Sequence, residues 1–442
     1  MNRDPIGKGV SRRDLLRYLA MGSAAVAAGP VIAACGGSSG GKSSSSSVAA
    51  GNVADITKFV PVDTAHSGKG MTLDMGVVLA FSGPGAFFGR VMSQGVKVAS
   101  KHIVELGGPT INPIFKDHKS GDPQAGVTAV KELGFSHVPM MLASYVDDLG
   151  AMLPGQAQYK IFTMDGGGGT STFGQGKPYF WGMRAITPND AVPGTVKYVT
   201  DKLTNVKKVQ LIGWDLGPLD DPIVKYVNGV VTGAGLQIAG PFIRTKVGAT
   251  DYSAAIQNAK SNKPDLILLS IYGNDPGYFM KQYVTSGLSA PVVIFEFTAD
   301  AAKVAGSSYD GVYFAYDYFN AKKPDNGWSS IFINDYKKAY GTDPDFYAAN
   351  YYEDTFAMWT VIQRALAKGA NVKDGTQLDA AMREDLSFKS VYGGDANTAG
   401  ELVLNPASHS VQKRPMSISQ YKGGNVTPLA YFNLNAADYR LA

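Results

Sequence analysis

Short apolar segments alternate with segments of helical periodicity through most of this 442-residue chain. An apolar segment at 72–80 is followed by a helical pattern at 89–106, and the same order recurs further along. Short apolar strands separated by helices indicate parallel sheets that are covered on both faces. A second series of the same plan begins after Pro188. The sequence therefore predicts an α/β fold with two lobes, each a doubly wound parallel sheet.

The expected elements form two series and a closing segment. The first series has strands at 72–80, 111–116, 138–143 and 160–164, with helices at 89–106 and 123–133. The second has strands at 208–213, 236–242, 265–271 and 291–295, with helices at 221–232, 251–260 and 276–286. The closing segment has helices at 329–340, 346–368 and 377–383 and strands at 401–404, 416–421 and 428–432. Ligands of such open sheets bind beyond the carboxyl ends of the strands, so the loops there are the places to search.

The first 34 residues have the features of an export signal. Arg12 and Arg13, which precede two leucines, resemble a twin-arginine motif, although the general secretion route stays open. The weakly apolar run at 19–34 is shorter than the ~20 residues that a helix needs to cross a bilayer. The pattern therefore favours a cleaved signal over a transmembrane helix.

Cys35 follows the small residues of the run IAAC, which is typical of a bacterial lipobox. It is the single cysteine of the chain, and lipid attachment would explain an orphan thiol in an exported protein. The Gly/Ser-rich stretch at 36–50 is typical of a flexible tether. We therefore predict a signal at 1–34, a lipidated cysteine with its tether at 35–70, and anchoring to the outer face of the cell membrane.

The charge of the body is close to neutral. Residues 1–34 hold five of the 41 basic and two of the 37 acidic residues, which leaves 36 basic against 35 acidic. A near-neutral body argues against nucleic acid as a partner. About 370 residues follow the tether, which is enough for two ordinary domains.

Motifs that carry catalysis or bind metals are missing from the sequence. Its five histidines have no metal-ligand spacing, and no G-x-S-x-G nucleophile elbow occurs. The single cysteine leaves no thiolate cluster. We therefore expect a binding protein without catalytic residues, metal or cofactor.

Two glycine-rich segments follow predicted strands. The segment at 83–89 mimics a dinucleotide fingerprint, but its last spacing is one residue too long. We interpret it as a turn that lets a ligand approach backbone N–H groups at the start of a helix. Gly166–Gly169 allows two interpretations, close backbone approach to a ligand or an exposed surface loop.

Several short features occur in a defined order along the body. They are Ser82-Gly83-Pro84, Asp122-Pro123 after a strand that ends in Asp117, the turn Ala143-Ser144, the glycine-threonine loop through Thr170, and Tyr351-Tyr352-Glu353-Asp354. From Met71 to the C-terminus the chain thereby resembles the Leu/Ile/Val-type, or type I, periplasmic substrate-binding proteins of ABC importers. The resemblance implies one lobe at 71–189 and 316–412, a second at 190–315 and 413–442, and three hinge segments.

The resemblance also implies a site that binds an amino acid between the lobes. Ser144 and Thr170 match positions whose hydroxyls bind the carboxylate, and Gly168 offers a backbone N–H. Glu296 matches the acidic position that pairs with the ammonium. Such a pairing is physically reasonable, because a buried charge needs a partner. The remaining matches are Tyr272, as an aromatic near the ammonium, and Phe87 and Phe88, as walls.

Each of these residues also has an ordinary structural interpretation. Ser144 could be a turn residue, Thr170 a loop hydroxyl, and Phe87 and Phe88 core side chains. Glu296 is harder to explain in this way, because it follows an apolar run and lies between two phenylalanines.

One loop departs from the family pattern. The family often has an aromatic residue followed by glycine in this loop, where the chain has Leu219-Asp220-Asp221. One of these aspartates could face the solute and favour a more cationic or amide ligand.

The sequence thus predicts a solute-binding lipoprotein of an ABC importer. It would capture a branched-chain-like amino acid, or a related small amine or amide, and deliver it as a monomer to permease subunits. Two alternatives stay open. One is a sensing receptor domain of the same fold, and the other is a secreted α/β enzyme such as a dehydrogenase or hydrolase.

Overall fold

The computed structural model describes residues 51–83, 85–120, 122–144, 146–167, 176–184, 191–433, 436 and 438–442, without the side chains of 146–149 and 219. The predicted signal and Cys35 lie outside the described residues. The end of the predicted tether needs a correction. Residues from Val53 on form the 3₁₀ helix η1 (Val53–Lys58), in which Ile56 is fully buried. Phe59 and Val60 are buried as well, so burial of these apolar side chains attaches 53–60 to the folded body.

The first sheet has eight strands in the order β12-β13-β14-β5-β4-β3-β1-β2. Its parallel strands are β1 (Thr72–Leu79), β2 (Thr110–Asp117), β3 (Met140–Ala143), β4 (Phe162–Asp165) and β5 (Phe180–Gly182). Three later strands pair with one another in antiparallel fashion: β12 (Ser387–Asp395), β13 (Thr398–Asn405) and β14 (Ser410–Lys413). β14 joins them to β5.

The second sheet has nine strands, eight of them in the order β17-β16-β15-β11-β10-β9-β6-β7, with β8 paired to β6. Its parallel strands are β6 (Lys208–Trp214), β7 (Gln237–Ile238), β8 (Ile243–Thr245), β9 (Leu266–Ser270), β10 (Val292–Ile294) and β11 (Tyr313–Asp317). Its antiparallel strands are β15 (Pro415–Lys422), β16 (Asn425–Asn433) and β17 (Arg440–Leu441).

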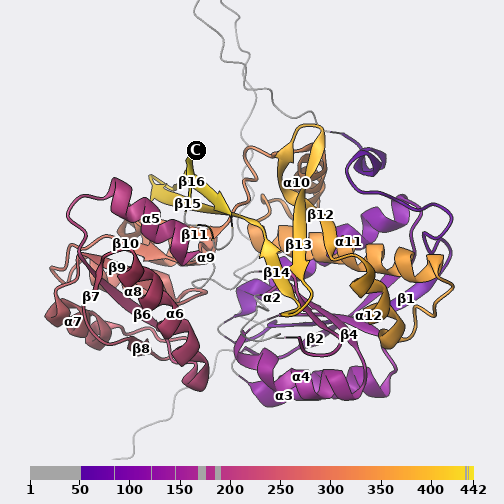
Figure 1. The fold of residues 1–442 in the computed structure, drawn as a ribbon, viewed down its shortest axis with the longest axis horizontal. Coiled ribbons are helices and arrows are strands. Elements are labelled where there is room, and N and C mark those ends of the chain that lie inside the picture. Colours follow the sequence, from indigo (N-terminus) through magenta and orange to yellow (C-terminus); the bar gives the residue numbers. More distant parts are fainter. Residues whose placement is uncertain are drawn as a thin grey trace, which may run out of the picture. The chain divides into compact units, whose positions relative to one another are not determined.

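Helices flank both sheets (Figure 1). Around the first sheet they are α2 (Ala86–Glu105), α3 (Pro123–Phe135), α4 (Val146–Gln158), α10 (Gly327–Tyr340), α11 (Phe346–Ala367) and α12 (Gly375–Glu384). Around the second they are α5 (Val192–Lys202), η2 (Gly217–Leu219), α6 (Asp220–Gly233), α7 (Ser253–Asn262), α8 (Asp275–Tyr283), α9 (Ala299–Ala305) and η3 (Gly306–Tyr309). α11 packs against α2 so closely that a Cβ on Gly95 would lie 2.1 Å from the Ala348 carbonyl oxygen.

The predicted two-sheet α/β class is confirmed, with the correction that both sheets are mixed. The closing strands add antiparallel edges to sheets whose other strands are parallel. The strand predicted at 236–242 is only the two-residue β7, because Gly240 and Pro241 interrupt it and proline has no N–H for a ladder. The elements α4, β5, α5, β8, α9, β11, β12, β14 and β17 were not predicted.

The chain passes between the sheets three times, after β5, after β11 and after β14. The predicted lobe boundaries stay a prediction. Among the described helices, none combines the length and the apolar character required to cross a bilayer.

Candidate ligand-binding site

Glu296 lies just beyond β10 and is 1% exposed. The backbone N–H of Gly273, which follows β9, donates to Glu296 Oε2 at 3.1 Å. The Tyr347 hydroxyl donates to Glu296 Oε1. Gly273 belongs to the second sheet's connections, whereas Tyr347 lies in α11 beside the first sheet. Glu296 therefore joins elements of both sheets at the carboxyl ends of parallel strands, where such folds bind ligands.

Burial raises the pKa of Glu296 to about 8, because the charged form loses its hydration. The nearby Arg184 guanidinium and the Gly273 N–H oppose this rise, whereas Asp345 and Asp317 add to it. At neutral pH the carboxyl is therefore mostly protonated. A cation placed against it would favour the ionised form.

Tyr347 is positioned by the start of α11. Asp345 caps this helix, since its side chain accepts from the Ala348 N–H at 2.8 Å. The Phe88 ring meets the Tyr347 ring edge to face, with centroids 4.8 Å apart. The Arg184 guanidinium lies 4.6 Å from the Tyr347 ring centre. The Tyr347 ring thus contacts an aromatic ring and a cation, while its hydroxyl reaches Glu296.

Phe87 and Phe88 lie in the first turn of α2 and are both buried. Phe88 contacts Tyr347, which places it beside Glu296's partner. Phe87 packs against Phe88 with centroids 5.6 Å apart and lies under the Arg90 guanidinium at 5.2 Å. Phe88 therefore lies against Tyr347, and Phe87 packs against Phe88. The role of ligand walls predicted for both residues stays a prediction.

Tyr272 follows β9 and is half-buried. Its ring meets Trp214 edge to face at 5.2 Å, and its hydroxyl lies 2.9 Å from Ser270 Oγ. Because Tyr272 precedes Gly273, its backbone leads directly to the N–H that holds Glu296. Tyr272 thus directly precedes the residue that bonds Glu296, and its predicted role near the ammonium stays a prediction.

Ser144 directly follows β3 and is fully buried, next to Ala143, whose carbonyl accepts from the Tyr351 hydroxyl. Gly168 and Thr170, the other predicted carboxylate-binding positions, lie outside the described residues. The roles predicted for all three residues stay predictions.

The start of the glycine run has a packing role. A Cβ on Gly166 would lie 2.1 Å from Asp354 Oδ2 and 2.4 Å from Asn350 Nδ2. Asn350 Nδ2 also donates to the Gly166 carbonyl oxygen at 2.6 Å. Gly166 therefore lets the end of β4 lie against α11, so this part of the run is not an exposed surface loop. Gly167 follows as a half-buried residue, with its N–H bonded to Asp165.

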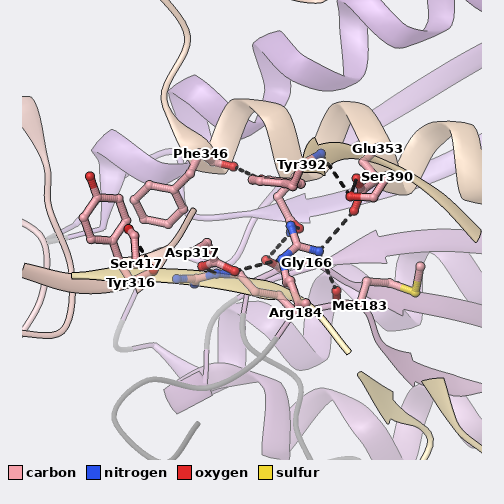
Figure 2. A network of polar contacts seen from close by, with 12 residues as sticks. Gly166, Met183, Arg184, Tyr316, Asp317, Phe346, Glu353, Ser390, Tyr392 and Ser417 are labelled. Atoms are coloured by element: carbon pink, nitrogen blue, oxygen red, sulfur yellow. Dashed lines mark hydrogen bonds and ion pairs between the residues drawn. The ribbon is translucent and has the colours of Figure 1, made fainter. Parts of the chain in front are cut away.

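A buried ionic network lies where the chain passes between the sheets (Figure 2). Asp317, at the end of β11, accepts from Arg184 Nε at 2.6 Å and from Arg414 Nε at 2.9 Å. Arg414 also donates to Glu353 Oε1 at 3.1 Å and to Asn350 Oδ1 at 2.7 Å. Arg184 follows β5 and Arg414 follows β14, so the network connects all three passages of the chain.

The glycines at 83–89 also have packing roles. Gly83 has a φ of +79°, and its Cβ would lie 2.8 Å from the Lys119 carbonyl oxygen. A Cβ on Gly89 would lie 2.0 Å from the Ala80 carbonyl oxygen. These close backbone approaches explain both glycines without a nucleotide.

The departing loop does not place Asp220 toward a solute. Asp220 is 2% exposed, accepts from the Leu216 N–H and pairs with Arg244 Nε at 3.0 Å. Asp221 is exposed, and its Oδ1 lies 3.5 Å from Arg244 Nη2. Both aspartates therefore pair with Arg244, which explains Asp220 without a ligand, and the suggestion that Asp221 faces the solute stays a prediction.

Within the described residues, histidine, cysteine and acidic side chains form no group of three or more that could hold a metal ion. The arrangement is typical of two-sheet α/β proteins that bind a small molecule beyond the ends of parallel strands. The chain belongs to the periplasmic binding protein family, which it matches over residues 72–425. The resemblance found in the sequence is thereby confirmed.

Curated relatives agree with this family. Leu/Ile/Val-binding protein homolog 1 of Brucella suis is 23% identical over 333 residues, covering 72% of this chain and 84% of the relative. The homolog of Brucella melitensis matches to the same extent.

Solved structures show the same fold. The leucine-binding protein LivK of Thermotoga maritima matches with a TM-score of 0.70 and 17% identity, covering 82% of this chain and 99% of that one. LivJ of Streptococcus pneumoniae, solved with isoleucine, has a TM-score of 0.68 and 20% identity, with 82% and 99% coverage. A solute-binding protein of an R. palustris ABC transporter, solved with benzoate, has a TM-score of 0.70 and 19% identity, with 83% and 96% coverage.

Two residues near Glu296 escaped the sequence analysis. Tyr347 lies four residues before Tyr351, so helical spacing puts both on one face, but α11 is buried at almost all positions and the spacing does not single out Tyr347. Arg184 follows the buried run Phe180–Gly182, and a charge in such surroundings was the signal that identified Glu296.

Proposed function

We propose that this chain is an extracytoplasmic solute-binding lipoprotein of an ABC importer. It binds a branched-chain-like amino acid, or a related small amine or amide, between two lobes and delivers it to permease subunits. The lobes correspond to 71–189 with 316–412 and to 190–315 with 413–442. The protein acts as a monomer and performs no chemistry, since ATP hydrolysis belongs to the partner subunits.

The observation that carries this proposal is the buried Glu296 carboxyl, held by Gly273 on one side and Tyr347 on the other. Burial disfavours the ionised form of Glu296, and a solute ammonium is a suitable partner for that form. In the bound state the ammonium takes the place of the Tyr347 hydroxyl at Glu296. Tyr347, Tyr272 and Phe88 then provide aromatic surface around the cation and the solute's side chain.

The membrane anchor completes the proposal. A lipid on Cys35, with the tether that follows it, keeps the binding protein close to its permease. A soluble binder without an anchor would diffuse away from a membrane that lacks an outer envelope.

An aromatic carboxylate is a second candidate solute. The mostly protonated Glu296 can donate a hydrogen bond as well as accept one, and it lies among aromatic side chains. Such a site would suit a ring that carries a carboxylate and a hydroxyl. The R. palustris protein solved with benzoate shares this fold.

A thermal-shift screen of the wild-type protein tests the proposal. Amino acids, amides, polyamines and benzoates are added one at a time, because a ligand that binds only the folded state raises the melting temperature. A solute at 100 times its Kd adds about 2.7 kcal/mol of stability. We expect a clear rise with at least one amino acid or aromatic acid. No rise with any of these compounds would contradict the proposed solute class.

Labelled-solute uptake separates transport from sensing. Cells that lack the gene should take up the bound solute more slowly than cells that have it. Unchanged uptake would favour the sensing alternative.

A further inference from the structure

Arg184 has a buried guanidinium group in which Nη2 makes no hydrogen bond to the described residues. It is 3% exposed, and two of its nitrogens have partners. Nε donates to Asp317 Oδ2 at 2.6 Å, and Nη1 donates to the Gly167 carbonyl oxygen at 3.3 Å. Nη2 is buried and has no acceptor within the described residues. Because a guanidinium stays charged, a buried N–H on it that lacks an acceptor lowers stability.

The Arg184 guanidinium contacts Gly167 and the Tyr347 ring, and each of these neighbours a residue predicted to bind one end of the solute. Gly167, which accepts from Nη1, directly precedes Gly168 in the loop through Thr170, predicted to hold a carboxylate. On another side the guanidinium lies 4.6 Å from the ring centre of Tyr347, whose hydroxyl donates to Glu296. Arg184 thus contacts Gly167, which precedes the predicted carboxylate positions in the sequence, and Tyr347, which contacts the residue predicted for the ammonium.

The surrounding network fixes the guanidinium. Asp317 accepts from Arg184 (Figure 2) and from Arg414. Arg414 in turn donates to Glu353 and Asn350. A donor that is already held in place loses little conformational freedom when it binds an anion. Arginine is well suited to this task because its planar guanidinium can present two parallel N–H groups to a carboxylate.

We infer that Arg184 binds the carboxylate of the solute through Nη2, and that Asp317 is the positioning residue that orients it. This inference rests on the proposed function and narrows it: the solute is a carboxylate, either an amino acid or an aromatic acid, and not a simple amine or polyamine. The competing explanation is that the Arg184 side chain has a purely structural role within the network of Asp317 and Arg414.

The test compares carboxylic acids with their uncharged amides on the wild-type protein. Calorimetry measures the Kd of isoleucine, isoleucinamide, benzoate and benzamide. The acid that binds should do so at least ten-fold more tightly than its amide, because a hydrogen bond to a charged group contributes more than a neutral one. Equal affinities for acid and amide would overturn the inference and leave the proposed function standing. Binding of an amide by a protein that binds neither acid would overturn the inference alone, and failure of all four compounds to bind would contradict the proposed function as well.

Two variants then test whether Arg184 causes the preference for the acid over its amide. In Arg184→Lys the charge stays but Nη2 is lost, so the ratio of amide Kd to acid Kd should fall about ten-fold. Arg383→Lys is the matched control, since Arg383 also pairs with an aspartate, Asp379, and lies over an aromatic ring, Trp181. Its ratio should equal that of the wild type. If Arg184→Lys weakened acid and amide equally, the role of Arg184 would be structural and the inference wrong.

A measurement on the wild type covers the case in which Arg184→Lys does not fold. Carboxyl-¹³C-labelled isoleucine or benzoate, whichever binds, is titrated with acid in the bound state and followed by NMR. A guanidinium contact should keep the bound carboxylate ionised to a lower pH than in free solution. A bound carboxylate that takes up its proton at the same pH as the free acid, or at a higher one, would overturn the inference.

Discussion

At the scale of residues, the Glu296 carboxyl receives two hydrogen bonds from its own chain, from Gly273 and from Tyr347. Arg184, Asp345, Asp317 and Tyr309 are the other titratable groups that interact with it. Because burial outweighs the guanidinium, the folded state keeps a proton that the unfolded chain would release.

Because folded Glu296 retains its proton, the free energy of unfolding should depend on pH. The pKa of Glu296 rises from near 4.5 in the unfolded chain to about 8 in the folded protein. Wild-type protein should therefore lose stability, relative to Glu296→Gln, as the pH rises from about 4.5 to about 8, and the difference should then level off. The change amounts to a few kcal/mol, since one pKa unit corresponds to about 1.4 kcal/mol. Urea unfolding of both proteins across this range measures it, and parallel stability curves would contradict it.

The sequence identified some of these residues and not others, for a physical reason. Glu296 stood out because a charge follows the apolar run of β10. Tyr347 did not, because α11 contains many aromatic residues and almost all of its positions are buried. Periodicity cannot tell which aromatic side chain of a buried helix faces the other sheet, because that depends on tertiary packing.

At the scale of elements, the contact between the end of β4 and α11 depends on the missing side chain of Gly166. In Gly166→Ala the new Cβ would lie 2.1 Å from Asp354 Oδ2, so helix or strand must shift. We expect a loss of about 1–3 kcal/mol in the free energy of unfolding. The control is Gly229→Ala on α6, where nothing lies within 4 Å of the new Cβ and alanine favours the helix. Equal effects of the two substitutions in urea unfolding would contradict this packing role.

The passage from β14 to β15 offers a second matched pair. Arg414→Leu removes a buried cation from Asp317 and Glu353, which should cost about 3–5 kcal/mol because two buried carboxylates lose a partner. Its neighbour Lys413 pairs with Glu401, and both side chains are 54% exposed. Lys413→Ala should therefore change stability by less than about 1 kcal/mol. Chemical denaturation compares the two, and a small effect of Arg414→Leu would show that the network contributes little.

The location of strands in the sequence was easier to predict than their pairing partners in the sheets. The apolar runs predicted β1, β6 and β9, because periodicity is a local property. That β14 pairs with β5 and β15 with β11 depends on contacts between segments far apart in the chain. No local pattern encodes such partners, so the mixed character of the sheets was missed.

At the scale of the whole molecule, α2 and α9 are joined by an ion pair between Arg90 Nη2 and Asp300 Oδ2 at 3.3 Å. Both side chains are largely exposed, so this pair contributes little stability compared with the buried Glu296 contact. Elements of the two sheets are therefore held together mainly by the three chain passages and by buried contacts. A solute that replaces one buried contact can change how these elements pack.

The proposed anchor makes a prediction for the exported protein. Cys35→Ser removes the acyl acceptor, so the protein should leave the membrane fraction and appear in the soluble exported fraction. Fractionation with immunodetection measures this, and wild-type protein should partition with detergent. Cys35→Ser protein that remained in the membrane fraction would contradict lipid anchoring.

The central proposal is that Glu296 binds the ammonium of an amino acid. Calorimetry of the wild type and of Glu296→Gln with the same amino acid tests it most directly. We predict at least a ten-fold loss of affinity in the variant, because a neutral amide cannot pair with the buried cation. Binding of the amino acid to the wild type should also release close to one proton from Glu296 at pH 7. This release makes the measured binding enthalpy depend on the ionisation enthalpy of the buffer. Unchanged affinity in Glu296→Gln would contradict the assignment.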